Sequence, residues 1–406
     1  MIQWEYAQNT RLIIKSWCRT LEDEALKQAQ NLANHPVTRE HIALMPDAHV
    51  GYGMPIGGVI ACEDALIPYA VGVDIGCGMG AIKTTVEAER LKDKSIRRTI
   101  IEEIKKEIPV GEAHCRDQQI PWEGFDAWRE TVDTEPLWFS ENKHRDLDRY
   151  NLGTLGGGNH FIELQESSDG AVWIMLHSGS RNMGYRIANC YHALAQQLNA
   201  ELHIELPDNN LAYLPAQHPL GQQYIRDMQF ALAYAWENRR IMMECVKTII
   251  EKYFPTVDYA LEVNIHHNYA AVEQYKGVPL WIHRKGATSA RAGEKGIIPG
   301  SMGTASYIVS GLGNTESFES CSHGAGRKMG RAEACRTLSL EMCDKTMEGI
   351  VFDRWKLSRT KDHHGKKILD LSEAPEAYKD IEEVLEAESD LVQPLVKLKP
   401  LAVVKG

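Results

Sequence analysis

The sequence lacks the features that define several common classes of protein. It has no run of about 18 consecutive apolar residues, which excludes a membrane-spanning helix. Its first residues also lack the basic and then apolar pattern of a secretory signal. The nine cysteines contain no Cys-x-x-Cys pair, so neither a disulfide-stabilised fold nor a zinc ribbon fits. We therefore expect a cytoplasmic protein with reduced thiols and no membrane partner.

The chain also lacks an excess of positive charge. It has 45 Lys and Arg against 56 Asp and Glu in 406 residues, which gives a net charge of −11. This balance argues against a protein that binds nucleic acid through its overall charge. Residues 281–336 differ, because they contain eight Lys and Arg against four Glu. The segment is either a solvated face or a local basic groove in an otherwise acidic protein.

Three familiar nucleotide motifs are absent. The chain has no Gly-x-x-x-x-Gly-Lys-Ser/Thr loop and no Gly-x-Gly-x-x-Gly loop. It also has no Lys-x-Asp-Gly, the motif of lysine-adenylating ligases, since residues 167–170 read Ser-Ser-Asp-Gly. Several glycine turns instead carry Ser, Arg or Lys, and such turns can offer backbone N–H groups, some with a cation, to phosphate oxygens. These turns are residues 177–181, 284–286, 300–303 and 323–327.

Strand and helix patterns both occur, without the regular alternation of a doubly wound sheet. No internal repeat or linker divides the chain, so we expect a single domain over residues 1–406 with a mixed α/β (α+β) fold and glycine turns gathered on one side. The acidic segment 372–390 is typical of a solvated helix face. Short β-like runs precede glycine turns at residues 69–74, 172–177, 261–267 and 279–283. Helical periodicity is clearest at residues 86–107, 185–204, 220–253, 328–350 and 376–388.

Five histidines lie in or beside the glycine-rich turns. Any one of them is more often a hydrogen-bonded structural residue than a ligand, but polar histidines that recur at strand ends have no packing reason to do so. Together they indicate a functional site, with a metal centre as one interpretation. The five are His160, His177, His266, His267 and His323.

A further motif combines a carboxylate and a thiol. Asp74 precedes Cys77 by three residues on a loop that three glycines make flexible. A thiolate can bridge two cations, and a single Cys among histidines suits Mn²⁺, Fe²⁺ or Zn²⁺ rather than a structural Cys-rich zinc site. The alternative is an Asp that caps the loop beside a buried free Cys.

The motifs taken together resemble those of the RtcB-type RNA ligases, and the similarity extends over nearly the whole chain. Each segment occurs in the order that this family has, which makes the set highly specific. The matching segments are Met45–Gly53 (MPDAHVGYG), Gly72–Met79 (GVDIGCGM), Gly158–Phe161 (GNHF), Leu176–Arg181 (LHSGSR), His266–Tyr269 (HHNY), Arg284–Gly293 (RKGATSARAG), Ile298–Gly303 (IPGSMG) and Ser322–Arg327 (SHGAGR).

The resemblance implies stacked β-sheets ringed by helices around a central dinuclear metal cleft. It also implies a ligase for RNA repair or tRNA splicing that uses GTP and two Mn²⁺ ions. The enzyme would join RNA with a 2′,3′-cyclic phosphate or 3′-phosphate end to RNA with a 5′-hydroxyl end, through a GMP-histidine intermediate and an RNA(3′)pp(5′)G end.

The family's site residues carry over to positions in this chain. His323 would become guanylylated. Asp74, Cys77 and His160 would hold one Mn²⁺, and Cys77, His177 and His267 would hold the other. Arg181, Lys285 and Arg327 would face phosphates. The residues implied around the GMP moiety are Asn159, Phe161, Glu163, Ser301, Ala325, Gly326, Tyr378 and Lys405.

Two other activities fit part of the same pattern. A dinuclear-metal cyclic phosphodiesterase would need no guanylyl acceptor such as His323, and a 3′-end guanylyl-capping enzyme would stop before sealing. Trp122, Trp128 and Trp138 lie in a stretch where the resemblance is weaker, and we interpret them as core or interface residues rather than as a surface for RNA bases. The oligomeric state is left open, and a monomer is compatible with the sequence.

Overall fold

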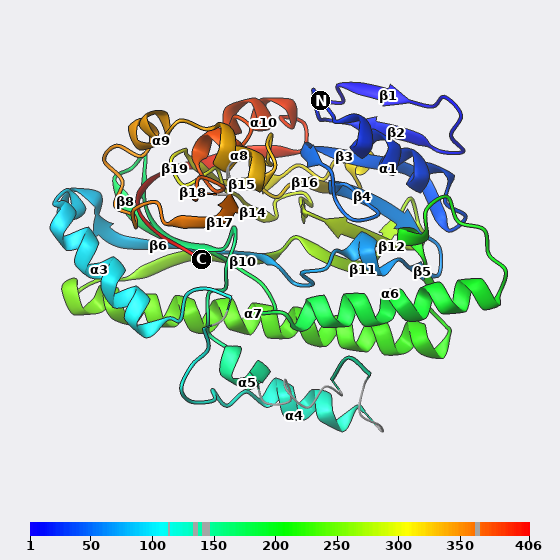
Figure 1. Ribbon diagram of the computed structural model, residues 1–406, viewed down its shortest axis with the longest axis horizontal. Coiled ribbons are helices and arrows are strands. Elements are labelled where there is room, and N and C mark those ends of the chain that lie inside the picture. Colours follow the sequence, from blue (N-terminus) through cyan, green and yellow to red (C-terminus); the bar gives the residue numbers. More distant parts are fainter. Residues whose placement is uncertain (113, 133–136, 140–146, 362–365) are drawn as a thin grey trace.

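The computed structural model describes residues 1–112, 114–132, 137–139, 147–361 and 366–406. Two large β-sheets form its centre, and helices lie around them (Figure 1). This arrangement confirms the mixed α/β class. None of the described helices is long and apolar enough to cross a membrane. That the chain forms one domain stays a prediction.

The first sheet has six strands in the order β1-β2-β3-β4-β12-β11. Only β2 and β3 are parallel, and the other neighbours are antiparallel. The strands are β1 (Trp4–Tyr6), β2 (Ile13–Ser16), β3 (Thr38–His49), β4 (Ile56–Cys62), β12 (Val278–Lys285) and β11 (Asn268–Tyr275).

The second sheet has seven strands in the order β10-β6-β8-β7-β19-β15-β14, all antiparallel to their neighbours. Three two-stranded pairs complete the described strands, namely β13 (Ala287–Ser289) with β16 (Ser320–Ser322), β17 (Leu357–Lys361) with β18 (Lys367–Leu369), and β5 (Ala65–Leu66) with β9 (Leu214–Pro215). The seven strands are β10 (Tyr259–His266), β6 (Gly78–Glu87), β8 (Ala171–Ser178), β7 (Phe161–Ser167), β19 (Val392–Lys405), β15 (Ser306–Gly311) and β14 (Lys295–Ile298).

Strand β8 shows why the second sheet is buried on both faces. Val172, Ile174 and Leu176 point to one side and join a core with the helices α3 (Lys94–Glu107) and α7 (Pro219–Tyr253). Trp173 and Met175 point to the other side and join a second core cluster. Successive side chains of a strand alternate between its faces, so the uninterrupted apolar run of β8 fits a strand covered on both sides.

A 35-residue helix, α7 (Pro219–Tyr253), runs beneath both sheets beside α6 (Met183–Glu201) (Figure 1). His218 caps it, because its Nδ1 accepts the backbone N–H of Leu220 at 3.2 Å, and Pro219 suits the first turn. Both helices confirm the periodicity predicted at 185–204 and 220–253. The other helices are α1 (Asp23–Asn34), α2 (Pro68–Val71), α3 (Lys94–Glu107), α4 (Glu123–Glu130), α5 (Leu147–Asn151), α8 (Arg331–Thr337), α9 (Leu340–Thr346) and α10 (Ile381–Ala387).

Several predicted elements differ from the structure. The strand predicted at 69–74 is wrong: the first residues form α2, because Pro68 favours a helical first turn, and Gly72 ends it at φ +98°. The helix predicted at 86–107 begins only at α3, which Asp93 caps, and a short 3₁₀ turn (Ala88–Leu91) precedes it. The helix predicted at 328–350 is two helices, α8 and α9, and that at 376–388 is a 3₁₀ turn followed by α10.

The tryptophans of the middle segment confirm the structural interpretation. Trp128 and Trp138 are buried, and the indole N–H of each donates to the buried carboxylate of Asp227, at 3.2 and 2.8 Å. Trp122 packs against Phe125. Trp122 also stacks on Phe230 of α7. These side chains attach α4 and the 3₁₀ turn Leu137–Phe139 to α7 and are not a surface for RNA bases. Residues 133–136 and 140–146 lie outside the described part of the chain.

Candidate active site

The loop that carries Asp74 and Cys77 ends at the start of β6. The backbone N–H of Cys77 donates to the carbonyl of Asp74 at 3.0 Å, and the side-chain amide of Asn268 donates to the same carbonyl at 3.0 Å. A side chain at Gly76 would meet Ala235 of α7 at 2.8 Å, and its φ of +79° favours glycine. The turn therefore folds tightly against α7, with both functional side chains on its inner side.

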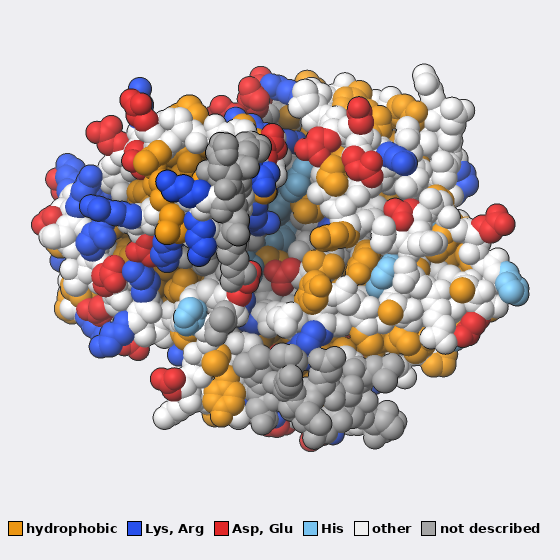
Figure 2. All heavy atoms as spheres, in the orientation of Figure 1, with side chains coloured by type: hydrophobic (Ala, Val, Ile, Leu, Met, Phe, Trp, Pro, Cys, Tyr) orange, Lys and Arg blue, Asp and Glu red, His pale blue; other side chains and the backbone are white. Residues whose placement is uncertain are grey.

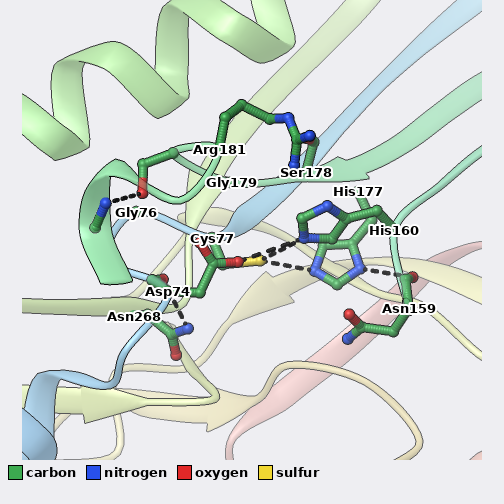
Figure 3. Close-up of polar contacts among 12 residues, drawn as sticks. Asp74, Gly76, Cys77, Asn159, His160, His177, Ser178, Gly179, Arg181 and Asn268 are labelled. Carbon is green, nitrogen blue, oxygen red and sulfur yellow. Dashed lines mark hydrogen bonds and ion pairs between the residues drawn. The ribbon is translucent and has the colours of Figure 1, made fainter. Parts of the chain in front are cut away.

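The predicted metal-binding side chains meet at this loop, and Figure 3 shows four of them, Asp74, Cys77, His160 and His177. The Sγ atom of Cys77 lies 3.5 Å from Nε2 of His160 and 3.2 Å from Nε2 of His177. A carboxylate oxygen of Asp74 lies 3.4 Å from the same nitrogen of His160. The Nε2 atoms of His177 and His267 are 3.4 Å apart. The structure therefore brings together all five residues that the sequence analysis named as metal ligands.

Hydrogen bonds fix which nitrogen of two histidines faces this cluster. Nδ1 of His160 lies 2.9 Å from the carbonyl of Leu155, and Nδ1 of His177 lies 3.2 Å from the carbonyl of Asn159. A carbonyl can only accept, so each Nδ1 carries a proton and each Nε2 presents a lone pair to the cluster. Burial lowers the pKa of His177 and His267 well below the usual range, which keeps these imidazoles neutral.

Three of the clustered side chains are placed so that they could bind the same metal ion. Cys77, His160 and His177 each direct one donor atom into a volume where these atoms all lie within 4.8 Å of one another. Burial, and then the Asp74 carboxylate, raises the pKa of the Cys77 thiol, so the thiol stays protonated unless a cation binds beside it. The Nδ1 atom of His267 is buried and has no hydrogen-bond partner in the described structure.

His266, the fifth histidine of the glycine turns, does not join the cluster. Its Nδ1 lies 3.0 Å from the carbonyl of Gly76, and Arg239 approaches the same nitrogen at 3.1 Å. Arg239 also donates to the Gly76 carbonyl, at 2.9 Å. His266 therefore lies behind the loop of Asp74 and Cys77 and helps to hold it.

His323 follows β16 and lies next to the cluster. Its ring centroid is 4.9 Å from that of His267. Nδ1 of His323 lies 2.6 Å from a carboxylate oxygen of Asp47, at the end of β3, and the backbone N–H of His323 donates to the same oxygen at 3.2 Å. Asp47 is completely buried. The carboxylate accepts a hydrogen bond from Nδ1–H, so the proton stays on Nδ1 while Nε2 keeps a lone pair and can act as a nucleophile.

A pocket of about 430 Å³ opens on one side of His323, a size that suits a small-molecule ligand. Glu163 lines it and is buried, and burial raises the pKa of this carboxyl to about 7. All the residues predicted around the GMP moiety line this one pocket, namely Asn159, Phe161, Glu163, Ser301, Ala325, Gly326, Tyr378 and Lys405.

A larger cavity of about 1430 Å³ is also lined by His323, and it contains Asp74, Cys77, His160 and His267, whereas His177 lines the smaller pocket. The two cavities share several lining residues, including His323 itself. His323 therefore stands where the smaller pocket meets the larger cavity, next to the five predicted metal ligands. We call these five, Asp74, Cys77, His160, His177 and His267, the donor cluster.

The three predicted phosphate-facing cations lie in different surroundings. Arg327 lines the smaller pocket. Lys285 lines the larger cavity and donates to the carbonyls of Tyr52 and Met54 at 2.6 and 2.9 Å, and burial lowers its pKa to about 7. Arg181 is buried behind the cluster, donates to Thr154 Oγ1 at 2.9 Å, and does not appear among the described lining residues of either cavity.

Two residues of the site were missed by the sequence analysis. Asp47 stands in a segment that matches the family, but nothing in its sequence neighbourhood marks it as the partner of His323. Glu373 belongs to the acidic segment predicted to be a solvated face, and that prediction is wrong for it. Its carboxylate pairs with Arg327, Arg331 and Lys405, each at 3.2 Å, and accepts the hydroxyl of Tyr378.

Comparison with known proteins agrees with this geometry. A profile of the family described as "tRNA-splicing ligase RtcB" matches residues 28–406. The chain belongs to the RtcB family. It is 40% identical over 410 residues to the RNA-splicing ligase RtcB of Escherichia coli strain K12, and the alignment covers 97% of each chain. It is 30% identical to the tRNA-splicing ligase RtcB of Thermococcus kodakarensis, over 95% of this chain and 92% of that one.

A third RtcB protein, the tRNA-splicing ligase RtcB of Archaeoglobus fulgidus, is 31% identical over 97% of this chain and 93% of its own length. The similarity therefore spans both sheets, both cavities and the donor cluster. Membership of the RtcB family confirms the resemblance drawn from the sequence motifs.

Proposed function

We propose that this RtcB-family protein is a GTP-dependent RNA ligase. It joins RNA with a 2′,3′-cyclic phosphate or 3′-phosphate end to RNA with a 5′-hydroxyl end, in RNA repair or tRNA splicing. The observation that carries the proposal is the position of His323, which stands between a pocket of nucleotide size and a cluster of metal-binding side chains. A covalent acceptor at this junction can receive a group from one side and deliver it to a substrate on the other.

Two Mn²⁺ ions are the metals we propose. Asp74, Cys77 and His160 would hold one, and Cys77, His177 and His267 the other, with the thiolate of Cys77 shared. The mixed set of carboxylate, thiolate and neutral imidazole is compatible with Mn²⁺. When bound, the ions supply positive charge that offsets the negative charge of the phosphates.

Glu163 is the group that we propose selects guanine. A carboxylate offers two acceptors, which complement the adjacent N1–H and N2–H donors of guanine, whereas adenine lacks this donor pair. The carboxylate of Glu163 is buried and accepts one hydrogen bond, from Gln165 at 2.6 Å. A base that supplies two further donors would offset the cost of burying the charge.

In the first step, His323 takes the GMP group from GTP. Asp47 accepts a hydrogen bond from Nδ1–H of His323, so Nε2 is free to attack the α-phosphorus of GTP. A P–N bond forms to Nε2, the bond from the α-phosphorus to the bridging oxygen breaks, and pyrophosphate leaves. The Asp47 carboxylate stabilises the positive charge that grows on the imidazole ring.

Two further transfers complete the reaction. An oxygen of the RNA 3′-phosphate attacks the same phosphorus, the P–N bond breaks, and RNA(3′)pp(5′)G forms while Nε2 regains its lone pair. The 5′-hydroxyl oxygen then attacks the RNA phosphorus and expels GMP. A 2′,3′-cyclic end must first be hydrolysed to the 3′-phosphate. Arg327 lines the smaller pocket and Lys285 lines the larger cavity, where they can balance phosphate charge.

The decisive experiment is labelling with α-³²P-GTP and Mn²⁺ followed by denaturing electrophoresis. We expect a protein–GMP adduct that is labile in acid and stable in base, that is lost in His323→Ala, and that persists in a control variant of the exposed His203, His203→Ala. Sealing of an RNA with a 3′-phosphate should require the same residue. A His323→Ala protein that still ligates RNA would refute the mechanism.

Product analysis separates the alternatives. A cyclic phosphodiesterase would open the cyclic end with no protein–GMP adduct, and a capping enzyme would accumulate RNA(3′)pp(5′)G in place of joined RNA. The cytoplasmic location and a monomeric state stay predictions.

A further inference from the structure

Two tyrosines in the larger cavity have no part in the mechanism above. Tyr52, in the loop between β3 and β4, is 69% exposed, and Tyr185, in the first turn of α6, is 53% exposed. Both line the cavity that contains Asp74, Cys77 and His267. Large aromatic side chains left uncovered in a cavity beside a reactive site commonly mark a contact with a ligand.

The structure holds Tyr52 in place. Its backbone carbonyl accepts hydrogen bonds from the backbone N–H of Met54 at 2.7 Å and from Nζ of Lys285 at 2.6 Å. Its ring centroid lies 6.5 Å from that of Tyr69, and Tyr69 stacks on His192 at 3.7 Å. The ring of Tyr52 thus lies beside the stacked pair of Tyr69 and His192 and is tilted by 49° to the ring of Tyr69.

Tyr185 belongs to the same supported structure. Its backbone carbonyl accepts a hydrogen bond from the side-chain amide of Asn189 at 2.8 Å, and the oxygen of that amide accepts the hydroxyl of Tyr69 at 2.7 Å. Tyr52, Tyr69 and Tyr185 therefore form one connected group, which we call the tyrosine ridge. Because hydrogen bonds to their backbone carbonyls hold the main chain of Tyr52 and Tyr185, only the side chains lose conformational freedom when a ligand binds.

Net charge does not explain how this cavity would hold RNA. Its described lining residues include five Lys or Arg and five Asp or Glu, so they sum to zero. Among the cations, Arg354 and Lys356 are exposed and flank Trp355, whose indole N–H donates to Asp344 at 2.8 Å. Figure 2 shows Lys and Arg side chains on one side of a hollow with histidine inside it, and hydrophobic side chains on the other.

A ligand that suits this combination has a charged backbone and flat apolar faces. Single-stranded RNA has both, and its unpaired bases can stack on aromatic side chains whatever their sequence. In an A-form duplex the base faces are covered by neighbouring base pairs and are closed to such contacts.

We propose that the tyrosine ridge stacks on unpaired bases beside the RNA break, so that the enzyme selects ends with single-stranded flanks over blunt duplex ends. This assignment rests on the proposed function, because it places the RNA end in the cavity next to His323. The ridge holds the flanking bases while the terminal phosphate reaches the donor cluster. No preference for base sequence follows from it.

The test measures binding of a short single-stranded RNA with a 3′-phosphate, and of a blunt duplex of the same length, to four variants. Tyr52→Ala and Tyr185→Ala should each weaken binding of the single strand by about 5- to 150-fold, the loss expected for one stacked base. Tyr52→Phe and Tyr185→Phe should restore it, because the ring and not the hydroxyl makes the contact. Guanylylation by GTP should be unchanged in all four.

Trp236→Ala is the matched control. Trp236 is an exposed aromatic residue of α7 that is not among the described residues lining either cavity, so its loss should leave RNA binding unchanged. The slope of log Kd against log salt concentration should be the same in the tyrosine variants and the wild type, because no phosphate contact is removed.

The outcomes separate the two proposals. If the wild type is not labelled by GTP, the proposed function fails whatever the variants do. If the wild type is labelled and seals RNA while the alanine variants bind the single strand as tightly as it does, only the role of the ridge is refuted. An equal loss of affinity for the single strand and the duplex would also overturn the role of the ridge. Such a result would show that the tyrosines make a contact that does not depend on unpaired bases.

Discussion

Replacing Asp47 by Asn tests whether this carboxylate makes His323 a nucleophile. The variant keeps the shape of the side chain but removes its charge. If the new amide oxygen faces Nδ1 of His323, the hydrogen bond survives but is neutral. If the amide nitrogen faces it, Nδ1 must accept, the ring proton moves to Nε2, and the attacking lone pair is lost. Both arrangements slow guanylylation.

The structure sets the size of the effect. The bond between Nδ1 of His323 and Asp47 is 2.6 Å long, and Asp47 has no exposed surface, so water cannot replace the lost acceptor. A hydrogen bond to a charged group contributes about 1.5–3 kcal/mol. The hydrogen bond should stabilise the transition state by this free energy, because positive charge grows on the ring there. Its loss would slow guanylylation by about 10- to 150-fold, since about 1.4 kcal/mol corresponds to tenfold in rate.

Single-turnover labelling with α-³²P-GTP measures this rate directly. We expect Asp47→Asn to reduce the labelling rate by that factor, with GTP affinity and the melting temperature close to those of the wild type. Asp390→Asn is the control, because Asp390 also accepts a hydrogen bond, from Trp17 at 3.0 Å, but is not among the described lining residues of either cavity. Labelling of Asp47→Asn at the wild-type rate would refute the role given to this carboxylate.

Three further predictions follow from buried groups. Cys77→Ser should lower the number of bound Mn²⁺ ions, measured by elemental analysis after dialysis, and guanylylation should fall with it; full metal content in the variant would show that the thiol is not a ligand. Glu163→Gln should weaken GTP binding by about 10- to 150-fold and leave ATP binding unchanged. Because burial raises the pKa of Glu163 to about 7 and guanine needs the ionised form, GTP binding near pH 7 should release a proton and weaken as the pH falls. Calorimetry in buffers of different ionisation enthalpy measures this proton, and binding without proton release would contradict the contact. Glu388→Gln should raise the melting temperature at pH 8 but not at pH 5, since burial raises the pKa of Glu388 to about 8 from 4.5. The unfolded chain loses that proton first, so the wild type loses about 1.4 kcal/mol of stability per pH unit between those values. Equal melting temperatures at pH 8 would show that Glu388 carries no such cost.

The long elements could be predicted from the sequence, and the short ones could not. Helix α7 has 35 residues, so its buried side repeats over about ten turns and gives a strong 3.6-residue signal. The run at residues 69–74 is too short for its periodicity to distinguish a strand from a helix. The helix α2 depends on Pro68 at its start and on packing between α6 and the first sheet. The single helix predicted at 328–350 is interrupted between α8 and α9. Such an interruption depends on how each of the two short helices packs against the rest of the protein.

The acidic segment 372–390 shows a different limit. Its composition is that of a solvated face, but Glu373 pairs with three cations, Arg327, Arg331 and Lys405, that lie 32 to 46 residues away in the sequence. These pairs form only when the chain folds. Glu388 is buried and accepts the backbone N–H of Ser322 at 2.8 Å. A count of charges cannot tell which few acids have buried partners.

The sequence by itself determined the family to which the motifs belong and, through that resemblance, the predicted site residues. These are the proposed metal ligands Asp74, Cys77, His160, His177 and His267 and the proposed nucleophile His323. These assignments follow from residue types in short local segments, which sequence preserves. Only the tertiary structure decided that Asp47 meets His323 across 276 residues and that both tyrosines share one ridge. Such contacts depend on how strands and helices pack, and packing is a property of the whole folded chain.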